Sequence, residues 1–286
     1  MEIVKNKIKN LNYIVTFVFI VTTILWLIFV FSTKHSALYE GPIFEYILKP
    51  FLIGMTLLPI IGGILGFYRS KEWGGWQSKM GRALIAISLG LFGWGSGMIF
   101  WNYYLFFMDV EVPYPSLGDL FYVMTWPFWT YAMLCLFKVT GANYGFKKSG
   151  GKILAFILPI IVVLVSYYLL FQVARQGQLD LSGGLASNLL AFLYPIGDVS
   201  ILLMSALVFS LSYKFLGGVY RKPILILLLG FVLNYIADVV FVFTTTTDTY
   251  FNGHFVDFLY VVMLFTVSMG ISKLSPTLLD SQENNS

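Results

Sequence analysis

Apolar residues in this chain form long stretches that alternate with short polar segments. A helix that crosses the hydrocarbon core of a bilayer needs about 20 apolar residues. Eight stretches meet this length: residues 11–32, 47–68, 83–107, 119–137, 153–173, 188–213, 224–243 and 256–272. Lipid offers no hydrogen-bond partners to a backbone, so such segments must be helical. The pattern therefore predicts an all-α fold, a polytopic membrane bundle of eight transmembrane helices.

The composition excludes the other common classes. Of the 286 residues, 58% are apolar and only 11% are charged, whereas about a quarter of the residues are charged in soluble domains. A soluble domain of this composition would have too few polar side chains to cover its surface. Disordered chains and coiled coils are excluded by the same numbers. The expected surroundings of the chain are therefore a lipid bilayer.

The basic residues predict an orientation in that bilayer. Of the 18 Lys and Arg residues, only Lys34, Lys49 and Arg175 fall on one side of the predicted bundle, and all others fall on the side that holds both termini. Cytoplasmic loops carry the excess of Lys and Arg. We therefore expect both termini to be cytoplasmic. The first apolar segment follows basic residues, as in a signal peptide, but it is too long for one and lacks a cleavage site.

The predicted spans form one transmembrane domain, residues 1–273, followed by a polar segment, residues 274–286, that we expect to be a disordered cytoplasmic tail. Similar short motifs recur at an offset of about 140 residues. They suggest two four-helix repeats, 11–138 and 153–272, related by an axis along the membrane normal. Chance similarity in a biased composition is the alternative.

The carboxyl groups inside the predicted membrane are the main candidates for function. Asp198 lies near the midplane of its span, and Asp238 lies in the outer half of the next one. Asn234 precedes Asp238 by one helical turn on the same face, at about the depth of Asp198. An ionisable group in a membrane costs several kcal/mol unless it is paired, protonated or hydrated. We therefore expect these three residues to form a cluster between the two helices.

Further polar and aromatic residues gather toward the extracytoplasmic side of the bundle. Aspartates begin two of the predicted helices there, where the helix dipole alone could explain them. Tryptophans and tyrosines could line a cavity, although packing and interfacial anchoring explain many aromatic residues in membrane helices. The candidate ligand-binding residues are Asp198, Asp238, Asn234, Asn102, Asp119, Asp257, Tyr194 and Trp101.

Two interpretations of these residues remain open. In the first, the aspartates form hydrogen bonds between helices and only fix their packing. In the second, they line a hydrated cavity that binds a small ligand, a cation or a proton. The sequence favours neither interpretation over the other.

Enzymatic chemistry has little support in the sequence. It contains no phosphate-binding loop, no zinc-protease motif and no nucleophile elbow. The single cysteine, Cys135, falls in an apolar stretch, and both histidines, His35 and His254, fall in predicted loops. We therefore expect no catalytic residues, no cofactor, no metal site and no nucleic-acid partner.

A series of short motifs resembles a known family. The series comprises residues 93–103, 113–122, 194–198, 237–238 and 250–260, with the elements Pro115-Ser116-Leu117-Gly118-Asp119-Leu120-Phe121-Tyr122 and Tyr194-Pro195-Ile196-Gly197-Asp198. It resembles the multi-spanning membrane module that precedes GGDEF diguanylate cyclase, EAL phosphodiesterase and histidine-kinase domains in bacteria and archaea. The resemblance implies a prokaryotic cell membrane and a role in sensing. Because this chain carries no such output domain, it also implies a separate kinase or cyclase as partner.

The leading hypothesis is therefore a sensory or ligand-binding membrane module without its own output domain. The alternative is a transporter, either of a small solute or coupled to protons, that uses the intramembrane aspartates. The repeat and the carboxyl group at the midplane favour this alternative. The ligand expected in both cases is an unknown small molecule or cation.

Overall fold

The computed structural model describes residues 2–32, 41–147, 149–179, 181–212 and 220–276. It is 87% helical, and the described residues contain no strand. The predicted all-α fold is therefore confirmed. The described part of the predicted tail is limited to residues 274–276, and residues 277–286 lie outside the described ranges.

Eight helices are long and apolar enough to cross a membrane, as predicted. They are α1 (Glu2–Ser32), α2 (Lys49–Glu72), α3 (Lys79–Tyr103), α4 (Leu117–Val139), α6 (Ser149–Ser166), α7 (Gly184–Ser212), α8 (Arg221–Thr246) and α9 (Phe255–Lys273). Most of them extend beyond the predicted limits because the helix continues into polar residues at the ends of an apolar stretch. Lys, Glu and Arg are good helix formers and allow this extension.

Three π-helical segments adjoin membrane helices, and one short helix connects α4 to α6. Segments of π-helix, Phe44–Leu48, Tyr104–Met108 and Tyr167–Ala174, adjoin α2, α3 and α6. The short helix α5 (Ala142–Lys147) lies between α4 and α6. The apolar pattern predicted neither the π-helical segments nor α5.

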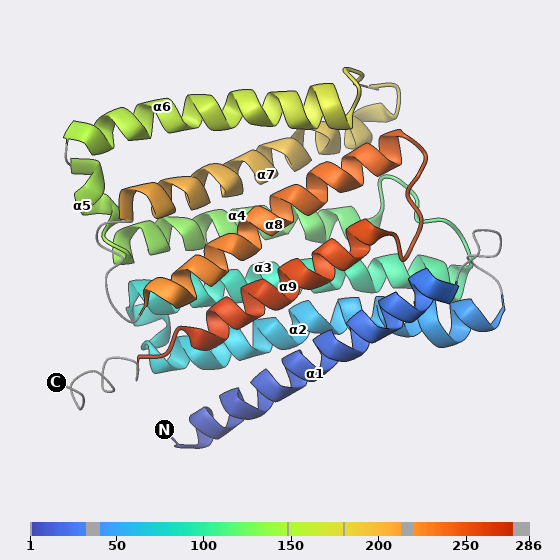
Figure 1. Cartoon of the computed structure of the whole chain (residues 1–286), viewed down its shortest axis with the longest axis horizontal. Helices are drawn as coiled ribbons and strands as arrows, with labels where there is room; N and C mark the ends of the chain where they lie inside the picture. Colours follow the sequence, from blue (N-terminus) through green and yellow to red (C-terminus); the bar gives the residue numbers. More distant parts are fainter. Residues whose placement is uncertain (1, 33–40, 148, 180, 213–219, 277–286) are drawn as a thin grey trace.

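Sequential membrane helices run antiparallel, and α1 begins at the same end of the bundle at which α9 ends (Figure 1). We call this the terminal end, and the opposite one the far end. Helices α1 and α6 lie on opposite flanks (Figure 1), and the most apolar window of each is only 17% buried. The corresponding windows of α2, α3 and α9 are 61%, 67% and 61% buried. Helices α1 and α6 therefore present most of their surface to lipid.

The central helices pack closely because small residues allow their backbones to approach. A Cβ atom added at Gly270 of α9 would lie 2.8 Å from the Cα atom of Leu227 in α8. Gly90 and Gly97 of α3 similarly leave room for the rings of Trp129 and Tyr122 in α4. Close approach of this kind is typical of membrane helices, where packing replaces the hydrophobic effect as the force that joins them.

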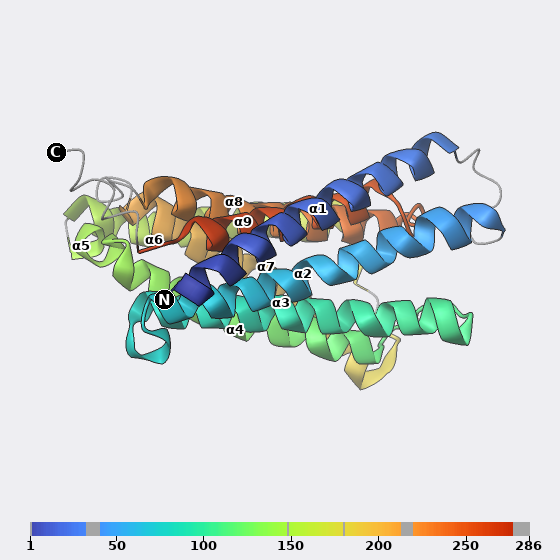
Figure 2. The same ribbon diagram turned by 90° about the horizontal axis from the view of Figure 1, so that it is seen from below.

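The contacts between helices follow a regular pattern. Each helix of α1–α4 contacts the next, as does each helix of α6–α9, and the two groups meet where α2 and α1 contact α9 and where α4 contacts α7. Exchange of the two groups turns the α2–α9 contact into the α4–α7 contact, whereas the α1–α9 contact has no counterpart of similar extent. Figure 2 shows the same helices from below. The contacts therefore match the predicted repeat only in part, and the internal repeat itself stays a prediction.

Candidate ligand-binding cavity

A cavity of about 720 Å³ lies between α3, α4, α7, α8 and α9. Pockets for small molecules span roughly 300–1,000 Å³. Its lining includes residues from the connections before α4, α7 and α9, all of which lie at the far end (Figure 1). The cavity therefore occupies the half of the bundle away from the termini.

Apolar side chains fill the other half of the bundle. On α4 and α8 the lining of the cavity reaches no deeper than Trp129 and Asn234. Toward the terminal end, the space between the helices is taken by side chains such as those of Ile87, Met133 and Phe231, which have no exposed surface. The cavity thus ends near the middle of the bundle.

Four aspartates from four helices line the cavity: Asp119, Asp198, Asp238 and Asp257. The only basic residue in the lining is Arg175. Asp198 and Asp257 are each 3% exposed, so their carboxyl groups depend on the protein or on a bound molecule for hydrogen bonds. The four carboxyl groups differ in their hydrogen-bond partners, and only Asp198 among them has a buried oxygen without one.

Asp119 caps α4 and links this helix to α7. Its Oδ2 accepts hydrogen bonds from the backbone N–H of Ser116 at 2.6 Å and from the Ser116 hydroxyl at 2.9 Å. Its Oδ1 accepts a hydrogen bond from the hydroxyl of Tyr194 at 2.5 Å. Both carboxyl oxygens of Asp119 therefore have partners. The reciprocal bonds between Ser116 and Asp119 form a capping box.

Asp257 has an equivalent place at the start of α9. Its Oδ2 accepts a hydrogen bond from the backbone N–H of Gly253 at 2.6 Å, and its Oδ1 accepts one from the Tyr250 hydroxyl at 3.1 Å. The first bond satisfies a backbone group just before the helix. The stabilising role that the sequence suggested for aspartates at these two helix starts thus agrees with their geometry, and both residues also line the cavity.

Asp238 lies deeper, on α8. Its Oδ2 accepts a hydrogen bond from the Asn234 amide at 2.5 Å, and its Oδ1 accepts one from the Tyr260 hydroxyl at 2.7 Å. Asn234 and Asp238 lie one turn apart on one face of α8, as the spacing predicted. The bond from Tyr260 joins α9 to α8.

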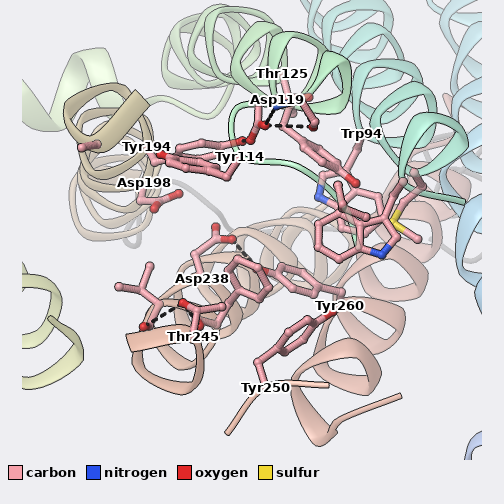
Figure 3. A pocket seen from close by; sticks show the side chains of 18 of the residues that line it. Trp94, Tyr114, Asp119, Thr125, Tyr194, Asp198, Asp238, Thr245, Tyr250 and Tyr260 are labelled. Atoms are coloured by element: carbon pink, nitrogen blue, oxygen red, sulfur yellow. Dashed lines mark hydrogen bonds between the residues drawn. The ribbon is translucent and has the colours of Figure 1, made fainter. Parts of the chain in front are cut away.

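Asp198 differs from the other three. Its carboxyl group points toward that of Asp238 across the cavity (Figure 3), and the two groups interact electrostatically. The carboxyl group of Asp198 lies within hydrogen-bonding reach of the Asp238 carboxyl group and the Trp126 side chain. Its Oδ1 atom is buried and accepts no hydrogen bond within the described part of the chain. A buried acceptor without a partner is uncommon and calls for a ligand or a structural reason.

Aromatic rings form most of the remaining wall. Trp94 contacts the ring of Tyr122 at a centroid distance of 5.6 Å and that of Tyr260 at 5.4 Å. The rings of Trp126 and Tyr194 meet edge to face at 4.9 Å. Figure 3 shows Trp94, Tyr194 and Tyr260 near Asp119, Asp198 and Asp238. These rings give the cavity apolar walls around its carboxyl groups.

The far end of the cavity is lined by loop residues that the sequence did not single out. Arg175 directly follows the π-helical segment Tyr167–Ala174. It donates a hydrogen bond to the backbone oxygen of Ala191 in α7 at 3.0 Å. Partial burial lowers the pKa of Arg175, while Tyr114 opposes this shift. Burial and the neighbouring Asp119 raise the pKa of Tyr114, so this phenol stays neutral at physiological pH.

The structure brings together all the predicted site residues except Asn102. Trp101 donates a hydrogen bond to Asn252 at 2.9 Å at the edge of the cavity. Asn102 lies between α2 and α3, where its amide donates to the Thr56 hydroxyl at 2.8 Å. Sequence reasoning missed Tyr122, Tyr250 and Tyr260, although Asp119 and Asp257 are each followed by a tyrosine after three residues.

Metal coordination finds no support among the residues that the structure describes. They contain no group of three or more His, Cys, Asp or Glu side chains arranged to hold a metal ion. Cys135 is a free, buried thiol on α4.

Comparison with known proteins does not extend this picture. The chain shows no significant match to a family model, to a curated protein or to a solved structure. Its class therefore rests on the fold and on the composition of its helices. The chain is an integral membrane protein with eight transmembrane helices.

Proposed function

We propose that the protein is a sensory membrane module that takes up a small ligand from the extracytoplasmic side. The observation that carries this proposal is the unpartnered Oδ1 of Asp198, buried at the wall of a cavity large enough for a small molecule. An aspartate with a purely architectural role would have its oxygens satisfied by protein donors, as those of Asp119 and Asp257 are.

The position of the cavity supports a receptor. The cavity occupies the far half of the bundle, and the distribution of Lys and Arg predicts that this half faces the exterior. The packed apolar half separates it from the cytoplasmic ends of the helices. A ligand would then enter and leave on one side, while the helices carry its effect to the other.

Hydrogen bonds between helices offer a means of transmission. Tyr194 joins α7 to α4 through Asp119, and Tyr260 joins α9 to α8 through Asp238. A ligand bound beside these groups would compete for the hydroxyls or draw the carboxylates toward itself, and so change how the helices lie against each other. A separate kinase or cyclase at the cytoplasmic ends is the partner that would respond.

The experiment that tests this proposal is thermal unfolding of the detergent-solubilised protein against a panel of small molecules. A ligand that binds only the folded protein raises the midpoint of unfolding, and the shift grows with the logarithm of its concentration above the dissociation constant. We expect stabilisation by at least one class of compound, with the shift lost in Asp198→Asn and kept in Asp248→Asn, which changes a loop aspartate outside the cavity. Stabilisation by no compound, or equal stabilisation of both variants, contradicts the proposal.

A transporter is the second candidate. The observation in its favour is that the cavity lies between two groups of four helices, α1–α4 and α6–α9, and that two of the contacts between the groups, α2 with α9 and α4 with α7, exchange with each other. Transporters built from two halves bind their substrates at such a boundary and open it alternately to each side. Uptake of a stabilising compound into liposomes, abolished by Asp198→Asn, would favour transport. Binding without uptake would favour the receptor.

A further inference from the structure

We propose that the ligand of the cavity is a small organic cation with at least one N–H group, such as a protonated amine, held between Asp198 and Asp238. This inference rests on the proposed binding function and names the chemistry of its ligand. It follows from the hydrogen bonds, the charges and the walls of the cavity, each of which restricts the ligand independently.

The hydrogen bonds leave the Oδ1 atom of Asp198 without a donor. The tyrosine hydroxyls beside the carboxyl groups already donate to other aspartates. A tyrosine hydroxyl donates a single hydrogen bond. Tyr194, Tyr250 and Tyr260 each donate to an aspartate other than Asp198. The Asn234 amide donates to Asp238 as well. The free Oδ1 of Asp198 therefore calls for a donor from the ligand, whereas a ligand that only accepts hydrogen bonds would leave this atom unsatisfied.

The charges favour a positive ligand. Two carboxyl groups that face each other in a low-dielectric interior cannot both ionise without strong repulsion, so such a pair keeps a proton while no ligand is bound. Asp198 and Asp238 face each other in this way across the cavity (Figure 3). A positively charged ligand between them can replace that proton and attract both ionised groups. The wider lining has the same bias, because it contains four aspartates and only one basic residue, Arg175.

The walls favour an organic cation over a metal ion. Calcium binds six to eight oxygen ligands, and magnesium requires a nearly ideal octahedron. The described residues offer no cluster of this kind. Trp126 packs against Tyr194, and Phe241 packs against Tyr250, so aromatic rings from α4, α7, α8 and the connection before α9 surround the aspartates. An ammonium group near aromatic faces gains cation–π attraction, and its carbon skeleton finds apolar surface.

The test compares matched sets of compounds that share a skeleton and differ in charge. One set is phenethylamine, 2-phenylethanol and 3-phenylpropionate, and a second is butylamine, butanol and butyrate. Each is added to the full chain in detergent at neutral pH, and the midpoint of thermal unfolding is measured. We expect an amine to raise the midpoint by an amount that increases with the logarithm of its concentration, while the alcohol and the carboxylate of the same skeleton do not.

Variants then locate the binding site. Removal of a charge that forms a hydrogen bond with the ligand costs about 1.5–3 kcal/mol, so Asp198→Asn should weaken amine binding by about tenfold or more. Asp248→Asn serves as the matched control and should bind as the wild type does. Should Asp198→Asn fail to fold, Asp238→Asn provides a second variant with the same expected loss.

The outcomes separate this inference from the proposed function. Stabilisation by an alcohol or a carboxylate, but not by an amine, overturns the organic cation and leaves a ligand-binding protein. Amine binding that Asp198→Asn and Asp238→Asn leave unchanged overturns the site. No stabilisation by any compound of either set overturns the inference, and the broader panel described above then decides whether the protein binds a ligand of another class.

Discussion

Tyrosine hydroxyls satisfy three of the four aspartates in the cavity, and the fourth aspartate faces the space between them. Tyr194, Tyr250 and Tyr260 each use their single donor for this purpose. The same bonds position the rings, because a hydroxyl fixed at one end leaves the ring little freedom. The shape of the cavity and the unpartnered Oδ1 of Asp198 therefore have a common origin.

Asn102 provides a test at the residue scale, because it was predicted to bind the ligand and lies elsewhere. Its amide joins α3 to α2 through the Thr56 hydroxyl. Hydrogen bonds between membrane helices contribute about 0.6 kcal/mol on average and at most about 1.7 kcal/mol. We expect Asn102→Ala to lower the free energy of unfolding by about 1 kcal/mol, as measured by denaturant titration, and to leave ligand affinity unchanged. A large loss of ligand affinity in Asn102→Ala would show that Asn102 contributes to ligand binding after all.

His254 predicts a dependence of stability on pH. Its Nδ1 accepts a hydrogen bond from the backbone N–H of Val256 at the start of α9, which requires a neutral ring. Partial burial lowers the pKa of His254, so the folded protein binds a proton less readily than the unfolded chain, whose histidines titrate near about 6.5. This contribution to stability is present above that pH and is lost as the pH falls through the lower pKa of the folded state.

The measurement is the midpoint of thermal unfolding between about pH 7.5 and about pH 5, a range that spans the histidine pKa. The wild type should lose more stability on acidification than His254→Asn, because asparagine caps the helix without titrating. Other groups that titrate in this range contribute equally to both proteins. Parallel pH profiles would show that His254 contributes nothing to the dependence.

At the residue scale, the depth of a side chain along its helix was predictable from the sequence, but the proximity of side chains in different loops was not. The spacing of Asn234 and Asp238 follows from helical geometry, and the depth of Asp198 follows from its distance to the end of the apolar stretch. Arg175 and Tyr114 belong to different loops, and their proximity depends on how α4 and α7 pack. No local pattern encodes that contact.

At the scale of the elements, close helix contacts make glycine positions sensitive. Gly270 of α9 faces the backbone of Leu227 in α8, and a backbone cannot move aside as a flexible side chain can. We expect Gly270→Ala to lower the free energy of unfolding by about 1–3 kcal/mol, the usual cost of overpacking. The measurement is denaturant unfolding of the purified protein.

Gly150 of α6 supplies the matched control. It lies in a helix, is exposed, and has no atoms within 4 Å of the place where a Cβ would lie. Gly150→Ala should be neutral or should stabilise the protein by up to about 1 kcal/mol, because alanine favours helix more than glycine does. Equal effects of the two substitutions would show that the α8–α9 contact does not depend on Gly270.

The eight membrane helices were predictable because the bilayer imposes one length on every span. The π-helical segments and α5 were not. A π-helical turn depends on one extra residue accommodated within a helix, and the hydropathy of the sequence carries no sign of it. The six residues of α5 are too few to show an apolar period.

At the scale of the whole molecule, the distribution of basic residues predicts which end of the bundle faces the cytoplasm. Because Cys135 is the only cysteine, a Cys135→Ala background lets one introduced cysteine report its position. Glu111 and Gln77 are exposed in connections at the far end and the terminal end, respectively. We expect a membrane-impermeant maleimide to label Glu111→Cys in intact cells and Gln77→Cys only after permeabilisation. The reverse pattern would invert the orientation.

The packed apolar half of the bundle has a consequence for vesicle experiments. Because the cavity ends near the middle of the bundle, it would sample only one of the two solutions that a bilayer around the helices separates. A compound unable to cross lipid would therefore saturate the protein in right-side-out vesicles and leave it empty in inverted ones. If the protein acts as the sensor proposed above, it would report the composition of the medium and would be indifferent to the same compound when the cell itself accumulates it.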